Sequence, residues 1–271
     1  IGGMWVANLY YWGFNQYITQ RALGAKSLPE AQKGVMFAAF LKLLMPIVVV
    51  LPGICAVVLI PQLDSPDTAY PAMMGLLPSG LLGLTFAALI AAIVSSLASM
   101  TNSVSTIFTM DIYKQFLSEQ VDERKLVVVG RNVALISIVV AALCAQPLLG
   151  NLESAFQYIQ NFTGFFTPGI LVIFLVALFW KKATSLSVLV AALASLILSI
   201  AMFMFAPDDF PFQHRMGIVF LVTGFLCYMT ALVQGYTDQE KAVDLNAINF
   251  QTSKGFNIST LVILVILIII Y

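Results

Sequence analysis

The chain has 271 residues, of which 60% are hydrophobic and only 10% are charged. A soluble domain normally carries about a quarter charged residues, so this composition excludes an ordinary water-soluble fold and indicates a protein surrounded by lipid. The formal net charge is +0, which leaves no positive field for binding nucleic acid.

Long apolar segments recur along the chain at the length that a membrane requires. A bilayer core about 30 Å thick needs roughly 20 mainly apolar residues per helix. The sequence therefore predicts an all-α membrane protein with seven full spans and a shorter eighth, at residues 4–22, 34–60, 81–110, 126–148, 155–180, 184–206, 215–235 and 257–271. Because the last segment stops short of a full span, we interpret the sequence as a fragment of a longer protein.

Charged residues alternate between the connections that this parse predicts. Basic residues gather in every other connection, and the connections between them carry mainly acidic side chains. By the positive-inside rule, the basic connections face the cytoplasm and residues 61–80 lie outside. The basic residues are Arg21, Lys26, Lys33, Lys114, Arg124, Lys125, Arg131, Lys181, Lys182, Lys241 and Lys254, and the acidic ones are Asp64, Asp67, Glu153, Asp208 and Asp209.

Side chains typical of enzymes and metal centres are poorly represented. Cys55, Cys144 and Cys227 each lie in an apolar stretch without metal-ligand spacing, and we interpret them as packing residues. The sequence shows no nucleophile–base set and no glycine-rich phosphate loop. His214 is the one histidine and falls in an outer connection. An enzyme is therefore not predicted.

The first predicted span carries a polar and aromatic stripe. Asn8, Tyr11, Trp12 and Asn15 recur at the spacing of one helix face. Amides donate and accept hydrogen bonds to hydroxyls, and an aromatic ring can pack on the C–H face of a pyranose, so the stripe suits a neutral polyhydroxylated ligand. The alternative is an interfacial aromatic belt combined with helix–helix contacts.

Lys42 is the most deeply placed basic residue, within the second predicted span. A charge at membrane depth costs at least a few kcal/mol, so it usually faces water, a partner or a substrate. The alternative is that its long stem reaches the cytoplasmic headgroups.

Hydroxyl side chains gather in the third predicted span, where Ser95 and Ser96 follow Ala92. Hydroxyl and carbonyl oxygens are suitable ligands for a small hard cation such as Na⁺. Small residues that let helices approach closely are the alternative explanation.

The fifth predicted span combines polar side chains with helix-breaking residues. It begins with Phe156, Gln157 and Gln160, and then meets Gly164 and the pair Pro168–Gly169. Proline removes a backbone donor and kinks a helix, so a bend is predicted here. Transporters place binding groups beside such broken helices, although a kinked packing helix is the alternative.

Taken together, these segments resemble the sodium:solute symporter family, especially its sugar-transporting members. Residues 8–21 (NLYYWGFNQYITQR) resemble the sixth core helix of that family, and the likeness continues through residues 41–43, 92–96, 109–113 and 156–160. The resemblance implies a partial LeuT-type inverted-repeat fold. Residues 1–180 would then form core helices six to ten, and residues 181–271 would form peripheral helices.

The resemblance also implies residue roles. Asn8, Lys42 and Gln160 would bind the sugar, with Gln157 nearby on the same helix. Tyr11 would form the inner gate beside Trp12, and Phe156 would belong to an outer hydrophobic gate. The carbonyl of Ala92 and the hydroxyls of Ser95 and Ser96 would bind Na⁺. The first core helix, which completes this sodium site in the family, is absent from the sequence.

The function implied is sodium-coupled symport of a galactose- or glucose-like sugar, with Na⁺ as the coupling ion, by a multi-pass protein of the cell membrane. Two alternatives stay open. One is a sodium-coupled symporter of another small polar solute, such as inositol, a sialic acid or an amino acid. The other is a passive solute facilitator.

Overall fold

The computed structural model describes residues 2–270 except 61, 64, 118–121, 150–154, 208 and 241. Among these described residues the chain is helical and contains no strand, which confirms the predicted all-α class. Four charged residues used in the sequence argument lie outside the described residues, namely Asp64, Glu153, Asp208 and Lys241.

The chain forms two compact units. The first comprises Ile1–Thr19 and Phe156–Ser253, and the second comprises Gln20–Ala155 and Lys254–Tyr271. These units follow spatial contacts. The predicted division at residue 180 into a transporter core and a periphery is a separate matter and stays a prediction.

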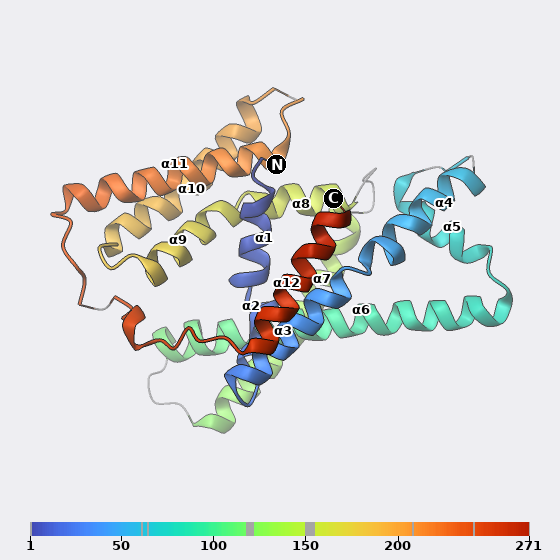
Figure 1. Cartoon of the computed structure of the whole chain (residues 1–271), viewed down its shortest axis with the longest axis horizontal. Coiled ribbons are helices and arrows are strands. Elements are labelled where there is room, and N and C mark those ends of the chain that lie inside the picture. Colours follow the sequence, from blue (N-terminus) through green and yellow to red (C-terminus); the bar gives the residue numbers. More distant parts are fainter. Residues whose placement is uncertain are drawn as a thin grey trace. The chain divides into compact units, whose positions relative to one another are not determined.

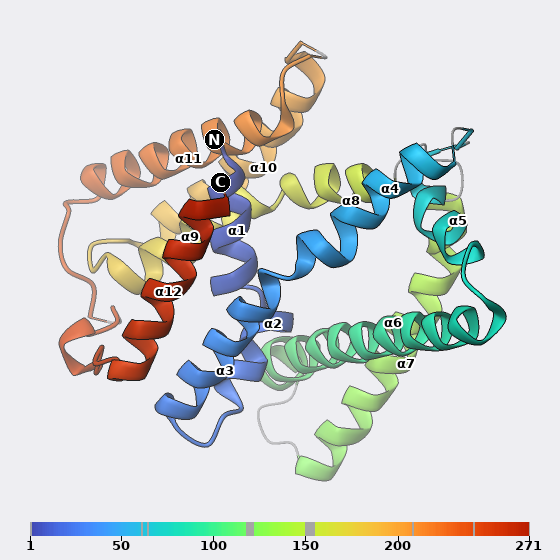
Figure 2. The same ribbon diagram turned by 45° about the vertical axis from the view of Figure 1, so that its right-hand side comes forward.

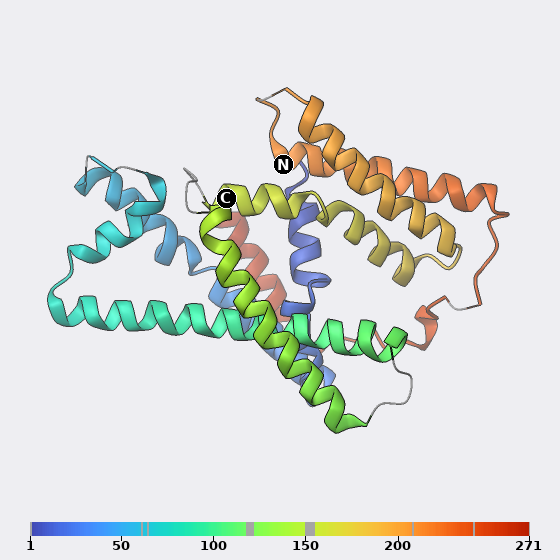
Figure 3. The ribbon, with the colours of Figure 1, turned by 180° about the vertical axis from the view of Figure 1, so that it is seen from behind.

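The first unit is built around a hairpin of two long helices, α10 (Ser185–Phe205) and α11 (Phe212–Val233), which lie side by side (Figures 1 and 3). Helix α9 (Thr167–Phe179) packs against both, and α1 (Met4–Gly13) packs against α9 and α11. Helix α8 (Ala155–Gly164) precedes α9 in the chain. Aromatic contacts fix α1, with Trp5 edge-on to Phe220 at 4.9 Å between ring centres.

Close packing in this unit depends on small residues. The buried positions of α10 are four residues apart, namely Ser187, Ala191, Ser195 and Ser199. A Cβ added to Gly169 of α9 would lie 2.5 Å from the Ser195 hydroxyl oxygen, so the α9 backbone lies directly against the Ser195 side chain. Such small-residue contacts are how helices associate in lipid, where no hydrophobic force drives them together.

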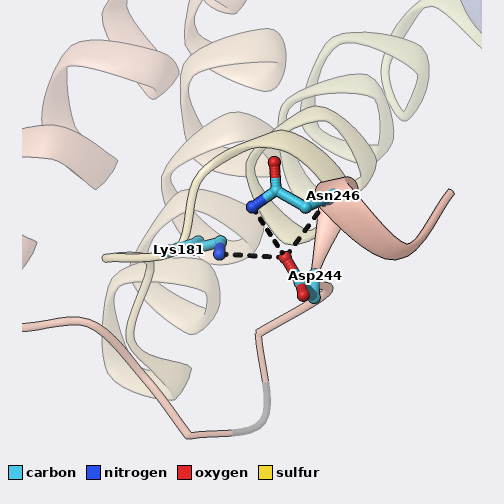
Figure 4. Close-up of polar contacts among 3 residues, drawn as sticks. All are labelled: Lys181, Asp244 and Asn246. Atoms are coloured by element: carbon cyan, nitrogen blue, oxygen red, sulfur yellow. Dashed lines mark hydrogen bonds and ion pairs between the residues drawn. The ribbon is translucent and has the colours of Figure 1, made fainter.

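The connection after α11 is held against the turn between α9 and α10 (Figure 4). The Lys181 ammonium lies 3.2 Å from the Asp244 carboxylate, and both the backbone and side-chain nitrogens of Asn246 donate to the same oxygen. The Asn246 backbone bond, followed by the bond and charge of Lys181, lowers the pKa of Asp244. Lys182 adds a cation–π contact, 4.0 Å from the centre of the Tyr236 ring.

The second unit contains the longest helix, α6 (Ser79–Ile107), which continues as the π-helix η3 (Phe108–Leu117) and is crossed by α7 (Glu123–Leu149) (Figures 2 and 3). Ser105 of α6 donates to the Gly130 carbonyl of α7 at 2.8 Å. Helix α2 (Gln16–Leu23) begins at the end of the first unit and enters the second. Further elements of the second unit are α3 (Leu28–Lys42), the π-helix η1 (Pro46–Val50), α4 (Leu51–Leu59), α5 (Ala69–Gly75) and α12 (Lys254–Ile270).

Five helical segments among the described residues are long and apolar enough to cross a membrane: Leu28–Leu59, Ser79–Phe116, Glu123–Leu148, Ser185–Phe205 and Phe212–Val233. A sixth is obtained if α8 and α9, which meet at 46°, form one bent span. The bend predicted within residues 155–180 is therefore confirmed. Residues 4–22 do not form one continuous helix as predicted, because α1 ends at Gly13 and α2 begins at Gln16.

The approach of α9 to α10 predicts a specific cost for Gly169→Ala. The added methyl group would clash with Ser195, so we expect the free energy of unfolding to fall by about 1–3 kcal/mol. Gly224→Ala on α11 is the matched control, because no atom lies within 4 Å of the added Cβ. The measurement is the temperature at which half of the buried Cys227 thiol has become reactive in detergent, taken for both variants. Equal midpoints for the two variants would contradict the packing argument.

Candidate functional site

Helix α1 carries the first group of predicted site residues. Asn8, Tyr11 and Trp12 are all exposed within the first unit. The rings of Tyr11 and Trp12 meet edge-on with centres 5.2 Å apart, and the Asn8 amide nitrogen donates to the Met4 carbonyl at 3.1 Å. This bond leaves the Asn8 side-chain oxygen as an acceptor. The group therefore offers an amide on the same short helix as an exposed pair of aromatic rings.

Asn15 does not continue this stripe. Its side-chain oxygen accepts a hydrogen bond from the Tyr17 backbone nitrogen at 3.1 Å, and its carbonyl accepts from Thr19. These are the bonds of a residue that caps the start of a helix, and α2 begins at the next position. The predicted four-residue face is therefore corrected to three residues. Asn15 has a structural part in starting α2.

Lys42 is exposed and is the last residue of α3, where a positive charge is favoured by the helix dipole. The α-helical hydrogen bonding changes directly after it, at the turn of Leu43 and Leu44 and then in η1, although Leu28–Leu59 as a whole forms one span as predicted. Pro46 explains this change. It has no N–H to donate to the carbonyl four residues earlier, which is that of Lys42, and its ring clashes with that carbonyl.

The predicted sodium ligands lie on α6, which runs through this region without interruption. Ala92 and Ser96 are one helical turn apart, and Ser95 lies between them on the same side. Hydroxyls further along α6 bond back to the helix, such as Thr101 to the Leu97 carbonyl at 2.6 Å. Among the described residues, the Ser95 and Ser96 hydroxyls make no such bond. These two hydroxyl oxygens suit a small hard cation, because oxygens that do not bond within the helix can serve as ligands.

Helix α8 carries the remaining predicted residues. Phe156 and Gln157 are exposed, and Gln160 is half-buried one turn later. The helix ends at Gly164, and α9 begins at Thr167 with Pro168 in its first turn. The Thr167 hydroxyl bridges the break by donating to the Thr163 carbonyl at 2.9 Å. The glutamines therefore lie on a short half-helix directly before the bend.

The two compact units divide the predicted site. The first unit holds Asn8, Tyr11 and Trp12 on α1, and Phe156, Gln157 and Gln160 on α8. The second holds Lys42 on α3, and Ala92, Ser95 and Ser96 on α6. Within the first unit, α1 packs against the helix that follows α8, with the Phe14 and Phe174 rings stacked at 5.2 Å. The role of each residue stays a prediction.

One polar cluster in the second unit was not assigned from the sequence. Gln20 of α2 donates to the Ser99 carbonyl at 3.3 Å and accepts from the Asn102 side chain at 3.4 Å. Arg21 donates to the Ser99 hydroxyl, which in turn donates to the Ser95 carbonyl at 3.0 Å. The cluster ties α2 to α6 beside the predicted sodium ligands. The spacing of Ser95, Ser99 and Asn102 on one face of α6 was the available signal.

Comparison with known proteins identifies the family. Residues 3–198 match the model of the sodium:solute symporter family. The chain is 47% identical over 290 residues to the sodium/glucose cotransporter of Vibrio parahaemolyticus, which covers 100% of this chain and 53% of that protein. The chain belongs to the sodium:solute symporter family. The resemblance inferred from the sequence is thereby confirmed.

Other relatives of this symporter chain carry different names. It is 28% identical to the uncharacterized symporter YidK of Escherichia coli, over 99% of the chain and 47% of that protein. It is 37% identical to the sodium/myo-inositol cotransporter 2 of Bos taurus, over 67% of the chain and 30% of that protein. The chain thus spans about half the length, or less, of these curated relatives. Members of the family are transporters and not enzymes, and the apolar helices agree with a multi-pass protein of the cell membrane.

The break after Lys42 predicts the effect of Pro46→Ala. The substitution restores an N–H that can donate to the Lys42 carbonyl, so α3 should extend past residue 42. The amide hydrogens of residues 43–48 should then exchange with solvent at least about tenfold more slowly. Pro29→Ala is the matched control, because Pro29 lies in the first turn of the same helix, where no N–H is needed. Hydrogen exchange of the detergent-solubilised protein measures both variants. Unchanged protection after Pro46→Ala would show that packing, and not the proline, imposes the break.

Proposed function

We propose that this symporter couples the inward movement of Na⁺ to uptake of a neutral sugar. The observation that carries the proposal is the position of the polar side chains next to helix ends and changes of helix type. Lys42 ends α3, Trp12 lies one residue before the end of α1, and Gln160 lies one turn before the end of α8. Membrane transporters build solute sites beside such interrupted helices.

The side-chain chemistry supports a sugar as the solute. Asn8 and Gln160 each supply an amide that can donate and accept, and Lys42 supplies three donors, so each of them suits the hydroxyls of a pyranose. Tyr11 and Trp12 supply an aromatic surface on the same short helix as Asn8. Similarity to a protein named as a sodium/glucose cotransporter points in the same direction.

The coupling mechanism follows from where the ion and the sugar would bind. Na⁺, as a transported ion, would bind the Ala92 carbonyl and the Ser95 and Ser96 hydroxyls. Binding of an ion can drive a solute only if the ion favours one conformation over another. We infer that sodium favours the outward-open state, to which the sugar then binds. Tyr11 would block the inner exit, and Phe156 would cover the outer side.

A second solute class is favoured by one specific observation. Relatives named sodium/myo-inositol cotransporter 2 match about two thirds of the chain. Inositol carries the same ring of hydroxyls as a pyranose, so the same amides and ammonium would serve. Competition between glucose, galactose and inositol for uptake separates these solutes. A passive facilitator is a different class, and uptake that does not depend on a sodium gradient would identify it.

Two variants of the full-length protein test the proposal in proteoliposomes. Lys42→Ala removes a charge-assisted hydrogen bond to the sugar, so the sugar concentration for half-maximal uptake should rise about tenfold to a hundredfold. The double variant Ser95→Ala with Ser96→Ala removes cation ligands, so the sodium concentration for half-maximal uptake should rise about tenfold at saturating sugar.

Lys33→Ala serves as the control, because its ammonium pairs with Glu30 on the exposed start of α3. Each variant should change mainly its own ligand's concentration dependence. Uptake by both variants that matches the Lys33→Ala control would remove these residues from the transport site.

A further inference from the structure

A hollow in the first unit lies behind the bend between α8 and α9. It is lined by residues of α8, α10 and α11, and the Met216 sulfur of α11 lies 3.3 Å from a Cβ built on Gly164 at the bend. The hollow has a volume of about 340 Å³ including its open mouth. The space that the centre of a water molecule can reach inside it is about 40 Å³. One water molecule needs about 10–15 Å³ of such centre-accessible space, so the hollow admits a small polar group but not a sugar.

Three polar side chains line this hollow, one from each helix, and all three can donate hydrogen bonds: Asn161, Ser199 and Arg215. Ser199 is only 8% exposed, and its hydroxyl has no hydrogen-bond partner among the described residues. A buried polar group without a partner is costly and points to a missing ligand or water. The convergence of donors favours an anion with several acceptor oxygens.

Arg215 supplies the positive charge. It is half-buried in the first turn of α11, and its Nε and Nη2 atoms both donate to the Phe210 carbonyl, at 3.2 and 3.0 Å. A guanidinium has five N–H groups, so this contact leaves further donors available. No carboxylate of a described residue lies within ion-pair distance of Arg215. The helix dipole at the start of α11 also favours a negative charge.

The rest of the lining is apolar. Ser199 lies in the last two turns of α10 and Arg215 in the first turn of α11, so the hollow lies near one end of two membrane-length helices. Phe203 lines it and is 58% exposed. Lipid phosphates lie near the ends of membrane-spanning helices, so a phosphate in the hollow would leave its acyl chains free to lie along the exposed Phe203.

We propose that the hollow lined by Asn161, Ser199 and Arg215 binds the phosphate of an anionic phospholipid. Arg215 and Asn161 would donate to the phosphate oxygens, and Ser199 would gain a partner for its hydroxyl. The lipid would join α8 to the α10–α11 hairpin directly behind the bend. The site is independent of which solute the symporter carries.

Photolabelling of the full-length protein in nanodiscs tests the proposal without measuring transport. A photoactivatable phosphatidylglycerol should label peptides of α8, α10 or α11, and Arg215→Gln should lower this labelling about tenfold. Arg124→Gln, at the start of α7 in the other unit, is the matched control and should label like the wild type. Equal labelling of Arg215→Gln and the wild type would overturn the proposal.

Competitors identify the ligand's chemistry. Unlabelled phosphatidylglycerol should displace the probe, whereas diacylglycerol and inorganic phosphate at the same concentration should not. Displacement by diacylglycerol would mean that no phosphate is recognised, and displacement by inorganic phosphate would mean that no lipid is needed. Either result would overturn the assignment.

Two further variants keep the test decisive. If Arg215→Gln does not fold, as judged by gel filtration, Asn161→Leu removes an exposed donor instead and should lower labelling a few-fold; unchanged labelling would overturn the proposal. Asp208→Asn tests a carboxylate of the neighbouring connection as the rival anion. Labelling that appears only after Asp208→Asn would overturn the proposal, because the aspartate would then be the group that Arg215 binds.

Discussion

Backbone groups in hydrocarbon have no water to bind, so a membrane helix must satisfy its own hydrogen bonds. Each place where it fails to do so is therefore informative. Helix α1 ends at Gly13, α3 ends at Lys42 and α8 ends at Gly164. Each break lies within four residues of a side chain that could bind a polar solute. Interruption of the helix and provision of polar groups thus coincide in both units, and membrane transporters place solute-binding groups beside such interruptions.

The continuous helices hold the remaining groups in fixed positions. Helix α6 presents the Ser95 and Ser96 hydroxyls from a continuous helix, and the Ser99 hydroxyl beside them links Arg21 of α2 to the Ser95 carbonyl. In the other unit, the small-residue contact between Gly169 and Ser195 holds α9 firmly to α10. Within each unit, continuous packed helices leave the breaks as the places where the backbone can most easily absorb a conformational change.

Much of this could be predicted from the sequence, but not all of it. Glycine and proline near residues 164–168 predicted the bend after α8, because their backbone effects are local. The effect of Pro46 on the Lys42 carbonyl was equally local and could have been predicted. The break at Asn15 was missed because an asparagine fits both a polar helix face and a helix cap. Bonds between Gln20 and Asn102 join residues far apart in the chain, so no local pattern predicts them.

Cysteine accessibility in the full-length symporter tests the central claim most directly. Asn8→Cys, Lys42→Cys and Gln160→Cys, made in a background without native cysteines, should each react with a water-soluble thiol reagent. Sodium and sugar together should slow all three reactions about tenfold, because the bound solute would cover each position. Leu189→Cys, at an exposed apolar position of α10, should stay unreactive. The account would be contradicted if the cysteines at positions 8, 42 and 160 did not react. It would also be contradicted if sodium and sugar left their reaction rates unchanged.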